Sequence, residues 1–97
     1  MPGKSLESPR SKGKKVRFEF YAPQALQVSL GGDFNGWDAN SLPMKKDKQG
    51  TWKIIVPLEP GKYEYRFWVD GVWADDPYVQ ERVQNPFGSQ NCVKIVS

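Results

Sequence analysis

Side chains that could form a binding surface occur at Trp37, Arg66, Trp73 and Asn91. An indole offers a flat apolar surface to the C–H face of a pyranose, and Arg66 and Asn91 can hydrogen-bond the hydroxyl groups at its rim. Covering roughly 100 Å² of apolar surface at about 25 cal/mol per Å² contributes about 2.5 kcal/mol per indole. Because association costs roughly 4 kcal/mol or more, two rings and additional hydrogen bonds are needed, which predicts weak binding of several linked sugars.

The same aromatic and cationic side chains could stack the bases of a single-stranded nucleic acid. A groove that follows a phosphate backbone needs several cations beside the rings. Here Asp70, Asp75 and Asp76 stand close to Trp73 in the sequence. Residues 1–15 hold five of the 14 cations and one of the 11 anions, so the rest of the chain carries nine cations against ten anions. The sequence therefore does not favour nucleic acid as a partner.

Catalysis and metal binding are poorly supported by the residue types. The chain has no histidine, which excludes a Ser-His-Asp or Cys-His nucleophile. Asp75 and Asp76 could be a glycosidase pair, but adjacent side chains usually point apart, whereas such carboxyl groups must flank a sugar. A calcium site with Asp70 lacks the ligand spacing of a dedicated loop. We expect no enzyme activity, no metal and no cofactor.

A hairpin over residues 60–77 is predicted to position Arg66 and Trp73. Alternating residues in 62–69 form a strand whose core face carries Tyr63, Tyr65, Phe67 and Val69. Asp70-Gly71 is typical of a two-residue type I′ turn. The chain then folds back and brings Trp73 to the outward face, beside Arg66 and Trp68.

Trp37 stands at a second turn, next to Asn35-Gly36. An exposed indole at a loop tip is unfavourable in water. Either Trp37 folds back as a lid on the end of the domain, or it is a platform for a ligand. We expect Phe34 to belong to the core instead.

Short alternating stretches rich in aromatic residues, and the absence of any long helical pattern, predict an all-β, antiparallel β-sandwich. With 97 residues the chain is long enough for one small domain, placed at residues 16–97. The other strands are expected at 16–21, at 27–30 with an end at Gly31-Gly32, at 42–46 as a short edge, at 51–58 with Trp52 in the core, and at 91–96. Residues 79–86 are expected to be irregular.

Residues 1–15 are rich in Ser, Gly, Pro and Lys, which predicts a disordered basic tail. This tail lacks interleaved aromatic residues and amphipathic spacing, so neither nucleic acid nor a membrane is expected as a partner. The sequence shows no signal peptide and no transmembrane stretch. One cysteine, Cys92, fits a reducing compartment. We expect a cytoplasmic location, with a plastid as the alternative.

Five stretches, in their order and spacing, resemble carbohydrate-binding module family 48 over roughly residues 16–97. They are Gly-Asp-Phe-Asn-Gly-Trp at 32–37, Pro-Gly-Lys-Tyr-Glu-Tyr-Arg-Phe at 60–67, Val-Asp-Gly-Val-Trp at 69–73, Asp-Pro at 76–77, and Asn91 before the closing strand. The family includes the glycogen-binding domain of AMP-activated protein kinase β subunits and the N-terminal domains of isoamylases and glycogen branching enzymes.

The resemblance implies an immunoglobulin-like β-sandwich that binds α-1,4-glucans such as glycogen, starch or maltooligosaccharides without catalysis. By this resemblance, Trp37 and Trp73 occupy the positions of two sugar-stacking tryptophans. The family's hydrogen-bonding lysine, ring-threading leucine, threonine and asparagine correspond to Arg66, Phe87, Ser89 and Asn91. These replacements keep the chemical character of each position.

Two alternatives stay open at the level of the sequence. Trp68, which faces outward beside Arg66, either extends the platform or packs beneath it. The whole module could also be a structural or protein-interaction sandwich that packs its tryptophans against a catalytic or kinase domain, in the same chain or another, without binding sugar by itself.

Overall fold

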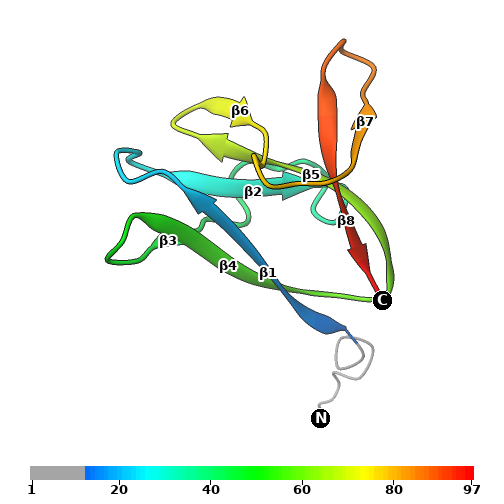
Figure 1. Ribbon diagram of the computed structural model, residues 1–97, viewed down its shortest axis with the longest axis horizontal. Helices are drawn as coiled ribbons and strands as arrows, with labels where there is room; N and C mark the ends of the chain where they lie inside the picture. The colour runs from blue at the N-terminus through cyan, green and yellow to red at the C-terminus, as the bar shows by residue number, and fades with distance from the viewer. Residues whose placement is uncertain (1–12) are drawn as a thin grey trace.

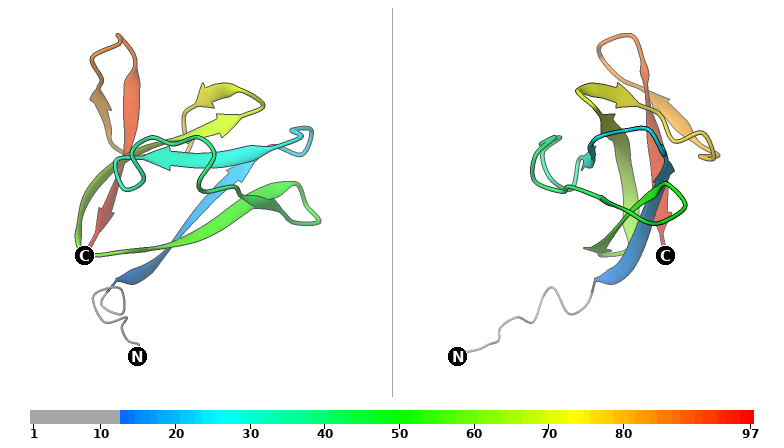
Figure 2. Two further views of the ribbon diagram at one scale, coloured as in Figure 1. Left: turned by 180° about the vertical axis from the view of Figure 1, so that it is seen from behind. Right: turned by 90° about the vertical axis from the view of Figure 1, so that its left-hand side faces the viewer.

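Eight antiparallel strands and no helix make up residues 13–97, which are the residues that the computed structural model describes. One sheet has the order β1-β4-β3, and the other has the order β2-β5-β8-β7 with β6 paired to β5. The two sheets form two layers (Figures 1 and 2). The strands are β1 (Lys14–Tyr21), β2 (Val28–Gly32), β3 (Lys45–Lys46), β4 (Thr51–Leu58), β5 (Gly61–Val69), β6 (Val72–Ala74), β7 (Arg82–Gln84) and β8 (Gln90–Val96). The predicted all-β, immunoglobulin-like sandwich is confirmed.

Aromatic rings from both sheets fill the space between the layers. Phe18 of β1 meets Tyr65 of β5 edge to face at a centroid distance of 5.0 Å, and Phe20 meets Phe67 at 4.8 Å. Phe67 is completely buried. Fully burying one such side chain contributes roughly 1.5–3 kcal/mol, so the alternation of β1 and β5 supplies much of the stability.

β5 is the central strand, since it pairs with β2, β6 and β8. Asp70 and Gly71 have φ angles of 48° and 89°, the two positive values that the predicted type I′ turn requires. The Asp70 carboxylate also accepts hydrogen bonds from the backbone N–H groups of Leu26 and Gln27 at 3.0 and 2.9 Å. These bonds attach the tip of the hairpin to the loop that precedes β2.

Several other predictions are confirmed. Trp52 of β4 is buried, and its Nε1 donates to the carbonyl oxygen of Ala22 at 2.8 Å. Phe34 packs against the core. The short edge strand predicted at 42–46 is present as β3, which covers only Lys45–Lys46. Residues 42–44 hydrogen-bond to β2 instead: Leu30 N donates to Leu42 O, and Met44 N donates to Val28 O.

Three boundaries differ from the prediction. Gly31 and Gly32 do not end the second strand but continue it, pairing with Arg66 and Tyr65. Part of the segment 79–86 is not irregular, because β7 pairs with β8 and closes that edge. β1 starts at Lys14, since its ladder with β4 continues to Leu58. Of the tail predicted for residues 1–15, residues 1–12 lie outside the described residues.

A partly buried polar pair connects β5 to the segment after β6. The Tyr65 hydroxyl donates to Asp76 Oδ2 at 2.8 Å, and Asp76 N donates to the Cys92 thiol sulfur at 3.3 Å. The pKa of Tyr65 is raised above its usual value, mainly by burial and secondly by the hydrogen bond to Asp76. The hydroxyl therefore stays protonated. Burial likewise raises the pKa of the Cys92 thiol. This pair holds the chain after Trp73 against the sheet.

Replacing Tyr65 with Phe should lower the free energy of unfolding by about 1–3 kcal/mol, because the Asp76 carboxylate loses its buried donor while the ring is kept. Urea unfolding followed by circular dichroism measures the loss. Tyr21→Phe, on the exposed face of β1, is the matched control and should leave the midpoint unchanged. An equal stability for Tyr65→Phe and the parent would show that the pair does not stabilise the fold.

Candidate functional site

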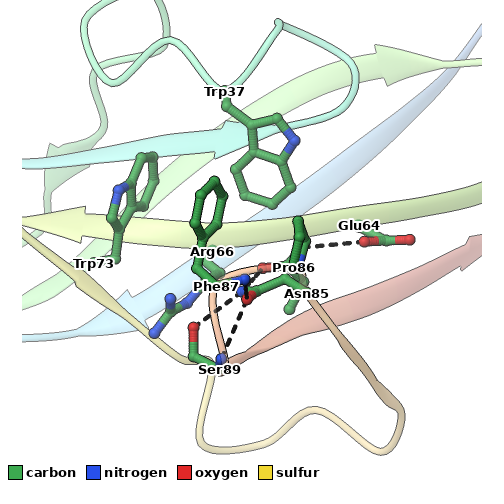
Figure 3. A pocket seen from close by; sticks show the side chains of 9 residues that line it. Trp37, Glu64, Arg66, Trp73, Asn85, Pro86, Phe87 and Ser89 are labelled. Atoms are coloured by element: carbon green, nitrogen blue, oxygen red, sulfur yellow. Dashed lines mark hydrogen bonds between the residues drawn. The ribbon is translucent and has the colours of Figure 1, made fainter.

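A cleft of about 480 Å³ lies on the outward face of the sheet that contains β5. Its floor comes from β5 and β8, and its walls come from the β2–β3 connection, from β6 and from the β7–β8 connection (Figure 3). The lining residues are Trp37, Glu64, Arg66, Trp73, Asn85, Pro86, Phe87, Ser89 and Asn91. The cleft therefore combines aromatic walls with a polar floor.

The wall that carries Trp37 is held by the side chain of Asn35. Its Oδ1 accepts from Gly32 N at 2.9 Å, and its Nδ2 donates to Asp38 O at 3.0 Å and to Ser41 Oγ at 2.9 Å. Trp37 has a φ of 61°, a left-handed conformation that costs an ordinary residue on the order of 1 kcal/mol or more. Its N–H is bonded to Gly32 O at 2.8 Å. The turn thus holds a partly buried indole at the cleft.

The second wall is Trp73 of β6, whose indole reaches over β5 to Gly31 of β2. A Cβ added to Gly31 would come within 2.6 Å of Trp73 Cη2, so the indole occupies the space of a missing side chain. Trp37 and Trp73 are 5.9 Å apart between centroids with their planes at 81°. The two indoles therefore present faces that are nearly perpendicular.

Trp68 lies outside the lining of the cleft. It pairs directly with Trp73 across β5 and β6, with centroids 4.8 Å apart and planes at 66°. Of the two alternatives for this residue, the geometry favours packing against the platform.

Arg66 is fixed on the floor by an ion pair. Its Nε donates to Asp75 Oδ1 at 2.9 Å, and its side chain is only 17% exposed. A guanidinium has five N–H donors, so this single bond orients the group and leaves donors on the terminal nitrogens for a ligand. Asp75 is thereby a positioning partner of Arg66.

The third wall is the β7–β8 connection, where the Phe87 ring is 90% exposed. Asn91 of β8 is 8% exposed, and its Nδ2 donates to Glu64 Oε1 at 3.0 Å. Its Oδ1 accepts from Asn85 Nδ2 at 3.1 Å. An exposed phenyl ring above a satisfied polar network leaves an apolar surface free for a ligand.

The structure brings six of the seven predicted site residues together around this cleft: Trp37, Arg66, Trp73, Phe87, Ser89 and Asn91. The sequence interpretation missed Glu64, Asn85 and Pro86. Glu64 has the same parity on β5 as Arg66, so the alternation could have identified it. Asn85 carried no such signal, because its segment was predicted to be irregular.

The candidate calcium ligands do not converge. Asp70 is bonded to backbone N–H groups, Asp75 to Arg66, and Asp76 to Tyr65. Within residues 13–97 no group of three or more His, Cys, Asp or Glu side chains is arranged to hold a metal ion. Each carboxylate has a structural partner instead. No helix in this part of the chain could cross a membrane.

The aromatic walls and polar floor agree with a match to a known family. The family model "Carbohydrate-binding module 48 (Isoamylase N-terminal domain)" matches residues 5–87. The chain belongs to this family. The resemblance inferred from the five sequence stretches is confirmed.

The relatives of this chain include enzymes that are named for their action on 1,4-alpha-glucan. The chain is 36% identical over 78 residues to a 1,4-alpha-glucan branching enzyme GlgB of Trichodesmium erythraeum, which covers 75% of this chain and 10% of that protein. It is 45% identical over 73 residues to Protein PTST homolog 2, chloroplastic, of Arabidopsis thaliana, with 75% and 13% covered. Protein FLOURY ENDOSPERM 6, chloroplastic, of Oryza sativa subsp. japonica is 43% identical over 53 residues, with 55% and 10% covered. The chain thus spans about a tenth of the length of these curated relatives.

Two adjacent glycines offer a test of how the Trp73 wall is built. Gly31→Ala should displace the indole from β2, because the new methyl group meets the outer edge of the ring. The exciton signal of the neighbouring tryptophans in circular dichroism should change, with little loss of stability. Gly32→Ala should instead lower the free energy of unfolding by about 1–3 kcal/mol, since its methyl meets the backbone carbonyl of Glu64 at 2.6 Å. An unchanged exciton signal in Gly31→Ala would contradict this arrangement.

Proposed function

We propose that the cleft binds neutral α-1,4-glucans, such as glycogen, starch or maltooligosaccharides, by stacking sugar rings on Trp37 and Trp73. The observation that carries this proposal is one cleft that joins two indoles and the exposed Phe87 ring to an arginine and an amide. Each ring offers an apolar face to the C–H surface of a glucose unit. Membership of a carbohydrate-binding family supports the same ligand class.

The angle between the indoles favours an α-linked chain. An α-1,4-glucan curves, so successive glucose units turn relative to one another, whereas a β-1,4 chain is a flat ribbon that suits coplanar rings. The planes of Trp37 and Trp73 differ by 81°. Two sugar units of a curved chain can therefore each contact one indole, and Phe87 can contact the inner side of the same curve.

Hydrogen bonds from the floor supply orientation. Arg66 is held by Asp75 and is oriented to donate to sugar hydroxyl groups, while Asn91 and Ser89 contribute an amide and a hydroxyl. Glu64 adds an acceptor, and its negative charge disfavours anionic polysaccharides. This assigns a binding role to six of the residues proposed from the sequence, and a supporting role beneath Trp73 to Trp68.

The module is proposed to be non-catalytic. A glycosidase needs two carboxyl groups on either side of the scissile bond, and Glu64 is the single carboxylate among the residues that line the cleft. We infer that the module directs a catalytic or other partner domain, in the same chain or another, to α-glucan. The relatives named chloroplastic make a plastid the alternative to a cytoplasmic location.

Calorimetric titration with β-cyclodextrin and maltoheptaose tests the proposal. The wild-type module should bind both in the micromolar to millimolar range, and cellohexaose should not bind. Trp37→Ala and Trp73→Ala should each weaken binding about tenfold or more, because the loss of one platform removes more than 1.4 kcal/mol. Tyr21→Ala removes an exposed ring from the other sheet and should leave the affinity unchanged.

Titration and thermal unfolding together separate the sugar-binding function from a structural or protein-interaction function. If neither α-glucan binds the wild type in the titration, the sugar-binding proposal is wrong, and a structural or interaction module is favoured. A large fall in the unfolding midpoint of Trp37→Ala would likewise indicate that this ring serves stability. Retained midpoints with lost binding would support the platform role.

A further inference from the structure

The loop from residue 85 to residue 89 is organised around one side-chain amide. Asn85 Oδ1 accepts hydrogen bonds from Phe87 N at 2.9 Å and from Ser89 N at 3.2 Å. The backbone closes the same loop, because Asn85 N donates to Ser89 O at 2.9 Å. Gly88, with a φ of 86°, takes the left-handed conformation that this tight closure needs. Hydrogen bonds to the Asn85 carboxamide therefore hold the backbone of this short loop in one conformation.

Phe87 depends on this loop for its position. Its ring is 90% exposed, so contacts with the rest of the domain cannot hold it in place. Its backbone N–H is bonded directly to Asn85 Oδ1. The backbone that Asn85 fixes therefore sets the point from which the Phe87 side chain leaves the loop at the cleft.

The other end of the same amide reaches the floor of the cleft. Asn85 Nδ2 donates to Ser89 Oγ at 3.0 Å and to Asn91 Oδ1 at 3.1 Å. Asn91 in turn donates from Nδ2 to Glu64 Oε1 at 3.0 Å. A donor on one side and an acceptor on the other determine which way the Asn91 amide faces.

We propose that Asn85 is the positioning residue of this cleft, which sets Phe87, Ser89 and Asn91 for the ligand before it binds. The predicted effect of Asn85 on glucan affinity rests on the proposed function, whereas its effect on the order of the loop does not. A loop that is ordered in advance loses less conformational freedom on binding, and a side chain ordered only on binding costs roughly 0.5–1.5 kcal/mol. Asn85 acts through its neighbours and is distinct from the rings and donors that stack or bond the sugar.

Asn85→Ala should weaken β-cyclodextrin binding by about two- to tenfold, because the ordering of the loop must then occur on binding. In a Phe87→Ala background the same substitution should cost a clearly smaller factor, since the ring to be positioned is gone. If Asn85→Ala weakens β-cyclodextrin binding by the same factor with and without Phe87→Ala, the two residues are not coupled and the proposal is overturned. Asn40→Ala, an exposed asparagine in a loop outside the cleft, is the matched control.

Asn85→Asp separates the two ends of the amide. The carboxylate keeps an acceptor for the N–H groups of Phe87 and Ser89, but it loses the donors and places a negative charge beside Asn91 Oδ1. We expect the loop to stay ordered while the affinity still falls, because the Asn91 amide is no longer held. Full wild-type affinity in Asn85→Asp would exclude the link to Asn91.

Amide hydrogen exchange without ligand makes the test independent of the glucan result. The Phe87 and Ser89 amides should exchange about tenfold faster or more in Asn85→Ala, as expected when a hydrogen bond worth about 1.4 kcal/mol is removed, and should stay protected in Asn85→Asp. Unchanged protection in Asn85→Ala overturns the proposal whatever the sugar titration shows. A wild type that binds no α-glucan, with protection lost in Asn85→Ala, would refute the proposed function and leave the ordering role of Asn85 standing.

Discussion

The alternation of side chains along β5 is the constraint on which both the fold and the cleft depend. Tyr65 and Phe67 point into the core, and Glu64 and Arg66 point to the opposite face, where they form the floor of the site. A slip of one residue in the pairing with β2 or β8 would exchange these two faces. Hydrophobic burial therefore fixes the register, and the register places the polar groups of the floor. The ion pair with Asp75 and the hydrogen bond from Asn91 then orient the side chains of Arg66 and Glu64.

Side-chain amides hold the two loops that overhang this floor, and they do so in the same manner. Asn35 bonds the backbone around Trp37, and Asn85 bonds the backbone around Phe87. In both cases a polar side chain satisfies N–H groups that no sheet ladder reaches, so an aromatic ring can be presented to solvent on an ordered backbone. The third ring, Trp73, is held differently, by the flat surface that Gly31 leaves on β2. Holding the rings in place before binding suits a shallow cleft. Each sugar contact contributes little binding free energy, so little is available to order a loop on binding.

The floor carries one negative charge beyond the Arg66–Asp75 ion pair, and this limits the class of ligand that fits. The Arg66 guanidinium is paired with Asp75, and Glu64 adds a second carboxylate that accepts from Asn91. A site with this balance suits a neutral ligand that is rich in hydroxyl groups. Membership of a carbohydrate-binding family and the shape of the aromatic walls favour the same class. This chain spans about a tenth of the length of the relatives it matches.

Local pattern was enough to predict the sandwich, the hairpin that carries Arg66 and Trp73, the turn at Trp37 and the burial of Trp52, because periodicity and turn chemistry act between residues close in sequence. The resemblance to a family added Phe87 and Ser89. Only the tertiary structure revealed that Gly31 and Gly32 continue a strand, since they pair with Arg66 and Tyr65 of β5 and the missing side chain of Gly31 makes room for the distant Trp73. The same holds for β7 and for the link from Asn85 through Asn91 to Glu64. Each of these depends on contacts between segments that folding alone brings together, and no local pattern records them.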